Sequence, residues 1–154
     1  MNVTVTDSGK PDIDESALAR FAETVLVAEN LDEESSVVIQ FVDDETIADL
    51  NETHMGKHGP TDVLSFPIED ATPGSPPIRM EGAPPLDLGD IFISTNVVEL
   101  HATEFEVSFS DELHLMVCHG LLHLLGWDHD TQAGAEAMER RESELLATIG
   151  IERR

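Results

Sequence analysis

The segment 119–129, HGLLHLLGWDH, is the feature that most constrains how this 154-residue chain can fold. His119 and His123 stand four residues apart, so on an α-helix both imidazoles lie on one face, rotated by only about 40°. Gly126 can adopt a positive φ, which ends a helix with a left-handed residue and turns the chain back. The segment therefore predicts a helix and a tight turn that bring His129 beside the other two histidines.

These three histidines predict a metal site. Two histidines at helical spacing in a Leu-rich segment are more often a packing feature, but the glycine and the third histidine at the right offset favour ligation. Three neutral imidazoles with one open position are typical of a catalytic zinc site, because structural zinc is usually closed by four protein ligands. Zinc lowers the pKa of a bound water towards 7 and can polarise a phosphate. We expect one Zn²⁺ per chain at His119, His123 and His129.

Gly120 separates this pattern from the zinc proteases that share its spacing. Metzincin proteases carry HExxHxxGxxH, with the glutamate acting as general base. Gly120 stands in the place of that glutamate and cannot accept a proton. A metzincin-like metalloprotease is therefore disfavoured, and the spacing by itself indicates a metal-dependent hydrolase of another bond.

The chain is strongly acidic, with 32 acidic and eight basic residues and a formal net charge of −24. RNA-binding proteins are normally basic, because phosphate contacts supply most of their non-specific affinity. One explanation is a salt-rich cytoplasm, where an acidic surface keeps proteins soluble and the Debye length at 1 M salt is about 3 Å. The alternative, an ordinary acidic protein, stays open.

A cytoplasmic location is predicted by three features. Cys118 is the single cysteine, which precludes an internal disulfide and suits a reducing compartment; we expect it to be a core residue. No apolar run reaches the roughly 18 residues that a membrane span needs. The first residues also lack the layout of a signal peptide.

Hydrophobic periodicity predicts one α+β domain over residues 1–154, with about four strands in a mixed sheet and helices on its faces. Residues 69–87 contain five prolines and are expected to form a surface loop. Asp90 is expected to begin the strand that follows this loop. The expected strands are 3–5, 37–42, 63–66 and the segment around 91–93; the expected helices run from Asp14 to about 30, from Asp43 or Asp44 through 50, from Thr95 to about 103, from Ser108 or Ser110 to Gly126, and from Asp130 or Thr131 to Gly150.

Three blocks resemble the YbeY family of bacterial zinc-dependent endoribonucleases: residues 119–129, residues 59–67 (GPTDVLSFP) and residues 88–91 (LGDI). The family usually has Tyr where Trp127 stands. The resemblance implies a core like that of zinc peptidases and a single-strand-specific endoribonuclease of 16S rRNA 3′-end maturation and ribosome quality control. It also implies an rRNA precursor as substrate and the small ribosomal subunit with its proteins as partners, with no DNA. A ribosome-assembly factor with a non-catalytic zinc site is the alternative.

The resemblance also suggests residues around the metal. Asp90 is a candidate active-site carboxylate, and Asp90 or Asp128 is suited to orienting a water or a ligand imidazole. Lys57 is the cation expected near the site, where it would contact phosphate. The family usually presents an arginine at the position of Met55, a departure that favours the assembly-factor alternative. No residue stands out as a general base.

The remaining histidines and the arginine pairs are weaker candidates for metal or phosphate binding. His54 and His58 are also four apart, but the surrounding glycines and proline favour a loop over a second metal site. His101 and His114 are expected outside the metal site. The arginine pairs 140–141 and 153–154 have the charge to contact phosphate, although such pairs are usually solvated.

Overall fold

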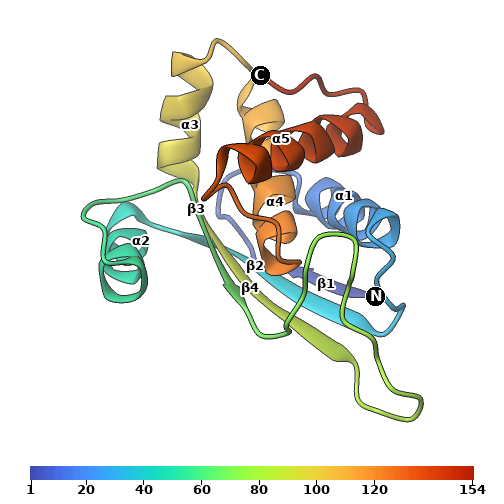
Figure 1. Ribbon diagram of the computed structural model, residues 1–154. Helices are drawn as coiled ribbons and strands as arrows, with labels where there is room; N and C mark the ends of the chain where they lie inside the picture. Colours follow the sequence, from blue (N-terminus) through green and yellow to red (C-terminus); the bar gives the residue numbers. More distant parts are fainter.

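A four-stranded mixed sheet forms the base of the fold (Figure 1). In the computed structural model, which describes residues 1–154, the strands are β1 (Asn2–Val5), β2 (Ser35–Val42), β3 (Val63–Pro67) and β4 (Leu86–Ser94). Their order is β1-β2-β4-β3. The first three in that order run parallel, and β3 pairs antiparallel with β4 at the edge. The predicted α+β class with a mixed sheet is confirmed.

The helices are α1 (Glu15–Ala28), α2 (Asp44–Leu50), α3 (Thr95–Glu104), α4 (Phe109–Leu124) and α5 (Gln132–Ala147), with a π-helical turn, η1 (Asn51–Met55), directly after α2. One side of the sheet carries α1, α3, α4 and α5, whereas α2 stands apart beyond its end (Figure 1). Contacts of α1 and α4 with one another and with the strands build the central layer, against which α3 and α5 pack. None of the helices combines the length and apolar character needed to cross a membrane.

Each of the five α-helices begins after a residue whose side-chain oxygen accepts a hydrogen bond from a backbone N–H of the first turn. This arrangement satisfies one of the amides that a helix start leaves without a partner. Thr95 was predicted as a cap but is the first helical residue, because the hydroxyl of the preceding serine reaches Val97 N. The caps are Asp14, Asp43, Ser94, Ser108 and Thr131.

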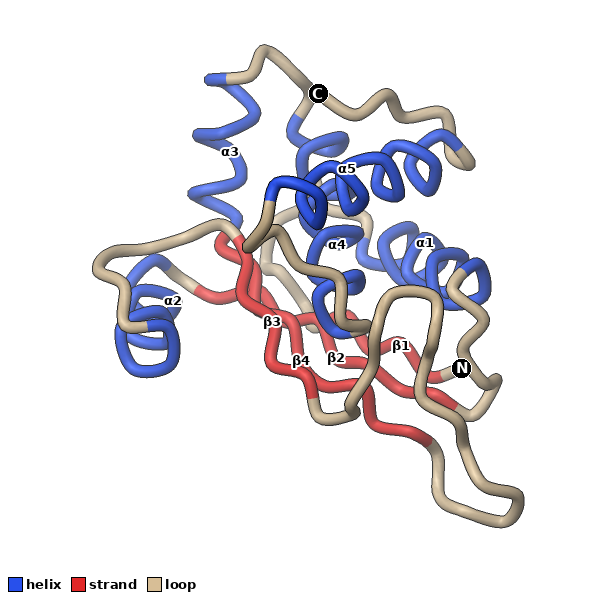
Figure 2. The backbone as a smooth tube through the Cα atoms, viewed as in Figure 1, coloured by secondary structure: helices blue, strands red, loops and turns tan.

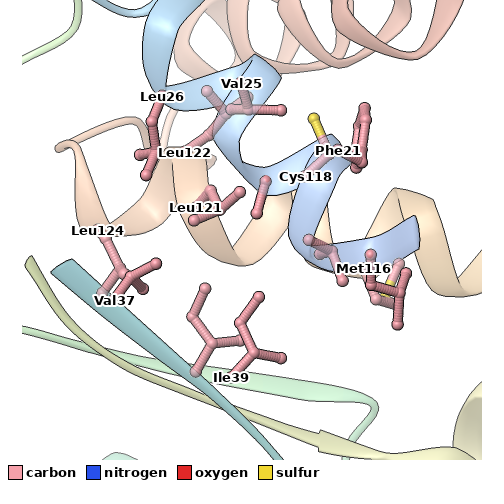
Figure 3. Packing of buried hydrophobic residues seen from close by; sticks show 14 of the residues in the cluster. Phe21, Val25, Leu26, Val37, Ile39, Met116, Cys118, Leu121, Leu122 and Leu124 are labelled. Carbon is pink, nitrogen blue, oxygen red and sulfur yellow. The ribbon is translucent and has the colours of Figure 1, made fainter. Parts of the chain in front are cut away.

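A cluster of 26 buried residues fills the space between the sheet and the helices. Figure 3 shows side chains of β2, such as Ile39, facing Leu121 of α4 and the apolar stripe of α1. Cys118 lies inside this cluster with 0% exposure, as expected. Its burial raises the pKa of the thiol far above the ordinary range, because a thiolate would lose its hydration there. Cys118 is therefore a core residue.

The long connection from residue 68 to 85 leaves the sheet and returns to it mostly as loop (Figure 2). The strand after it begins at Leu86, so the prediction that Asp90 begins the strand was wrong and Asp90 lies in its middle. Residues 51–55 were expected to be loop but form η1, which ends at Gly56 with a φ of 66°. The ring of His54 in this turn packs edge-on against the ring of Phe66, with the ring centroids 5.1 Å apart.

Candidate metal centre

The C-terminal end of α4 and the turn after it position the three histidines. Gly126 has a φ of 91° and reverses the chain, as its place in the sequence predicted. The reversal is fixed by hydrogen bonds from Gly126 N to His123 O and from Trp127 N to Leu122 O. A side chain at residue 126 would collide with the carbonyl oxygen of Ala71, because the 68–85 connection packs directly against the turn. Both the conformation and the packing therefore require glycine here.

His119, His123 and His129 come together at this point. One ring nitrogen of each lies within 4.8 Å of the others. The Nε2 atoms of His119 and His123 are 3.0 Å apart. The ring of His129 stacks on that of His119 with centroids 5.5 Å apart. His119 and His123 are half-buried and His129 is exposed, so the cluster is open to solvent on one side.

The hydrogen bonds of the two helical histidines set their tautomers. His119 Nδ1 donates to the carboxylate of Glu142 at 2.9 Å, and His123 Nδ1 donates to the carbonyl of Trp127 at 2.8 Å. Because both partners can only accept, each Nε2 is left with its lone pair free. Two facing lone pairs at this distance suit a cation between them. With His129, this donor set could hold a metal ion.

The arrangement also fits zinc in size and protonation. Two Zn–N bonds of about 2.0–2.1 Å at a tetrahedral angle place the nitrogens about 3.4 Å apart, close to the His119–His123 separation. Burial, followed by the proximity of His119, lowers the pKa of His123 to about 4. His123 is thus neutral at pH 7, as a metal ligand must be.

A cleft of about 440 Å³ opens beside the histidines. Lys57 and Asp128, both predicted for the site, line this cleft, and Lys57 is the one Lys or Arg among its lining residues. Met55, the last residue of η1, also lines it, so the position where the resemblance implies an arginine lies beside the histidines. Oδ1 of Asp128 accepts a hydrogen bond from the backbone N–H of Asp130 at 3.0 Å, which fixes the turn that presents His129.

Asp90 is the predicted site residue that the structure does not bring to this cleft. It pairs with Phe66 in the sheet. The next residue, Ile91, points towards α4, where it would contact a Cβ placed on Gly120. Since successive side chains of a strand point to opposite faces, Asp90 faces away from the metal helix.

The other histidines and the paired arginines do not line the cleft. His58 is 89% exposed, with its Nδ1 3.8 Å from a carboxylate oxygen of Glu52, and neither His54 nor His58 belongs to the histidine cluster. His101 binds Asp62 at 3.1 Å. Three of the four paired arginines contact carboxylates within the fold and are not free for phosphate, contrary to the possibility raised by their sequence: Arg141 with Glu29, Arg153 with Glu142 and Arg154 with Glu112.

Sequence reasoning missed Glu142, the buried carboxylate that contacts His119. A signal was present, because Glu142 lies four residues after Met138 and three before Leu145 on the apolar stripe of α5. A charged residue on such a stripe is buried only with a partner. That partner is 23 residues away, and spacing within the helix does not identify it.

Fold and site together define the class: an α+β protein in which one helix and its following turn gather three histidines at the wall of a cleft. The family model described as Endoribonuclease YbeY matches residues 4–150. The chain belongs to the YbeY family.

Curated relatives and a solved structure agree with this assignment. Endoribonuclease YbeY of Moorella thermoacetica is 43% identical over 138 residues, which cover 90% of this chain and 88% of that protein. Endoribonuclease YbeY of Lysinibacillus sphaericus is 40% identical over 81% of this chain and 79% of its own length. The solution structure of TM1509 from Thermotoga maritima superposes with a TM-score of 0.58 at 27% identity and covers 96% of this chain and 91% of that one.

Proposed function

We propose that this chain is a zinc-dependent endoribonuclease that cleaves single-stranded rRNA precursors in the cytoplasm, in 16S rRNA 3′-end maturation and ribosome quality control. The observation that carries the proposal is the cluster of His119, His123 and His129 at a cleft, in a family whose relatives are named endoribonucleases. Its partners would be the small ribosomal subunit and its proteins.

The residues around the cleft have different roles in this proposal. The three histidines would hold one Zn²⁺, which when bound supplies a Lewis acid and an acidified water. Lys57 would contact a phosphate of the RNA, a role supported by its position in the lining of the same cleft. Asp128 orients the turn that carries His129 and leaves its second carboxylate oxygen for a water. The proposal gives Asp90 no part in the chemistry, because it lies on the opposite face of the sheet.

Two other functions make different predictions. A ribosome-assembly factor with a non-catalytic zinc site is favoured by the methionine at position 55, where the family resemblance leads us to expect arginine. A metalloprotease is disfavoured by Gly120, which supplies no base and is fully enclosed. Neither alternative predicts chelator-sensitive cleavage of RNA.

The test is cleavage of a labelled single-stranded RNA spanning the 3′ end of a 16S rRNA precursor. The unmodified protein should cleave it with stoichiometric zinc, lose activity with chelator and regain it when zinc is restored. His123→Ala should lose most of the bound zinc and the cleavage together. His114→Ala is the matched control, because His114 lies on the same helix but outside the cluster. A duplex and a single-stranded DNA of the same sequence should remain intact.

The outcomes separate the alternatives. Equal cleavage by His123→Ala and the unmodified protein would overturn the metal-dependent assignment. Full zinc loading without any cleavage of RNA would favour the assembly factor. Chelator-sensitive hydrolysis of casein would instead support the metalloprotease alternative.

A further inference from the structure

Glu142 is a carboxylate buried beneath the metal cluster, with 1% of its side chain exposed. Both of its oxygens have partners. Oε2 accepts from His119 Nδ1 at 2.9 Å, and Oε1 accepts from Arg153 Nε at 3.1 Å. A carboxylate taken out of water is costly unless its oxygens are paired, and two opposed donors also fix its rotation. Glu142 therefore has one defined orientation, aimed at a metal ligand.

The second partner of Glu142 comes from the chain segment after α5. Gly150 has a φ of 76°, and the backbone N–H of Ile151 donates to the carbonyl of Leu146 at 3.0 Å, which folds the segment back along the helix. This reversal returns Arg153 to the side chain of Glu142. A continuous series of contacts thus runs from Arg153 through Glu142 to His119.

The neighbouring arginine makes a second, separate pair that serves as a comparison. Arg154 donates from Nε and Nη2 to the two oxygens of Glu112, at 2.7 and 2.9 Å. Glu112, like Glu142, is a glutamate with 1% exposure. Unlike Glu142, it contacts no histidine. These two buried glutamate–arginine pairs therefore differ in whether they reach the metal cluster.

We propose that Glu142 is a positioning residue of the metal centre, and that Arg153 holds it against His119. This inference rests on the proposed zinc site. The carboxylate fixes the ring of His119 with Nε2 towards the cluster, as the Trp127 carbonyl does for His123. No hydrogen bond holds the ring of His129, the exposed third member. The pair on α4 is thus pre-oriented from within the protein, and partners of this kind typically change metal affinity by 10–100-fold.

The experiment compares Glu142→Gln with Glu112→Gln. Zinc affinity is measured by competition with a chromophoric chelator, and the thermal midpoint is measured on the zinc-free proteins. Both substitutions are near-isosteric and should lower the midpoint, since each weakens a buried pair. Glu142→Gln should in addition weaken zinc binding by about tenfold and shift the visible spectrum of the Co²⁺-substituted protein. Glu112→Gln should leave the affinity within about twofold and the cobalt spectrum unchanged.

Arg153→Lys and Arg154→Lys test the role of the segment after α5 while keeping its charge. Lysine has no planar guanidinium with which to fix the carboxylate, so Arg153→Lys should weaken zinc binding by a few-fold. Arg154→Lys should have no effect on zinc binding. Unchanged zinc affinity and cobalt spectrum in Glu142→Gln would overturn this inference alone. An unmodified protein that binds no zinc would overturn the proposed function as well.

Discussion

Gly120 shows how a single residue shapes this metal centre. A Cβ placed on it would lie 2.9 Å from Cγ2 of Ile91 and 3.2 Å from Oγ of Ser65. The same serine hydroxyl donates to the carbonyl of Gly120 at 2.9 Å, so α4 lies unusually close to the edge of the sheet. A glutamate at this position would push helix and sheet apart as well as add a base. The lack of a peptidase base is therefore tied to how α4 packs.

His123 makes the stability of the zinc-free protein depend on pH. Burial and the nearby His119 lower its pKa from 6.5 to about 4 in the folded state. Between these values the unfolded chain binds a proton that the folded chain does not, so stability falls as the pH is lowered. We expect a loss of about 2 kcal/mol from pH 7 to pH 4, after allowance for the partial exposure of the ring. Urea denaturation with chelator present, compared with His123→Gln, should show this extra acid sensitivity in the unmodified protein alone. Parallel pH dependence in the two proteins would contradict it.

At the scale of the elements, the segment after α5 fastens two helices. Arg153 reaches Glu142 of α5 and Arg154 reaches Glu112 in the first turn of α4. The guanidinium of Arg154 also lies over the ring of Phe105, 3.6 Å from its centroid. Hydrogen bonding to Glu112 raises the pKa of Arg154, as expected for a cation stabilised by a buried carboxylate. Through Phe105 and Glu112, Arg154 therefore joins the end of α3 and the start of α4 to the chain that follows α5.

Removing Arg154 should destabilise the fold strongly, because it leaves Glu112 buried without a partner. Loss of one member of a buried ion pair typically costs about 3–5 kcal/mol, and we expect Arg154→Ala to lie near the lower value. Arg140→Ala is the control: Arg140 is exposed, and its loss should cost less than about 0.5 kcal/mol. The double substitution Glu112→Gln with Arg154→Ala should recover part of the loss. Denaturant unfolding measures all three, and equal stability of the two single variants would contradict the role of the pair.

The same elements show what the sequence could and could not predict. Local sequence signals were sufficient to predict the α-helices, the turn at Gly126 and the clustering of the three histidines. Apolar periodicity, capping residues and a glycine able to adopt a positive φ each act within a few residues. The start of β4 was misplaced, since Leu86 directly follows two prolines and a register shift interrupts its pairing with β2. Contacts such as Arg154–Glu112, 42 residues apart, depend on how the helices pack. Helical spacing carries no information about them.

At the scale of the whole molecule, the distribution of charge is as unusual as its sum. The net charge is −24, and only eight residues are basic. Arg141, Arg153 and Arg154 are paired with carboxylates inside the fold. Lys57 is left as the one Lys or Arg at the cleft, which is also lined by aspartates. Long-range electrostatics therefore oppose the approach of RNA, and attraction has to come from local contacts at the cleft.

This balance predicts an unusual salt dependence of RNA binding. Each cation–phosphate contact on a single strand contributes a slope of about −0.7 to the logarithm of affinity against the logarithm of salt, whereas screening of like charges acts in the opposite sense. We expect a slope shallower than that of two contacts for binding to a single-stranded rRNA precursor, measured by fluorescence anisotropy in KCl.

Met55→Arg should tighten this binding and steepen the slope by up to about one contact, because Met55 lines the cleft and is 42% exposed. Leu100→Arg is the matched control, since Leu100 is 68% exposed on α3 and does not line the cleft, yet the substitution changes the net charge equally. The salt slope of RNA binding by Leu100→Arg should stay near that of the unmodified protein. A slope of several contacts in the unmodified protein would show that RNA binds to another surface. Equal effects of Met55→Arg and Leu100→Arg would show that net charge, rather than position at the cleft, determines the affinity.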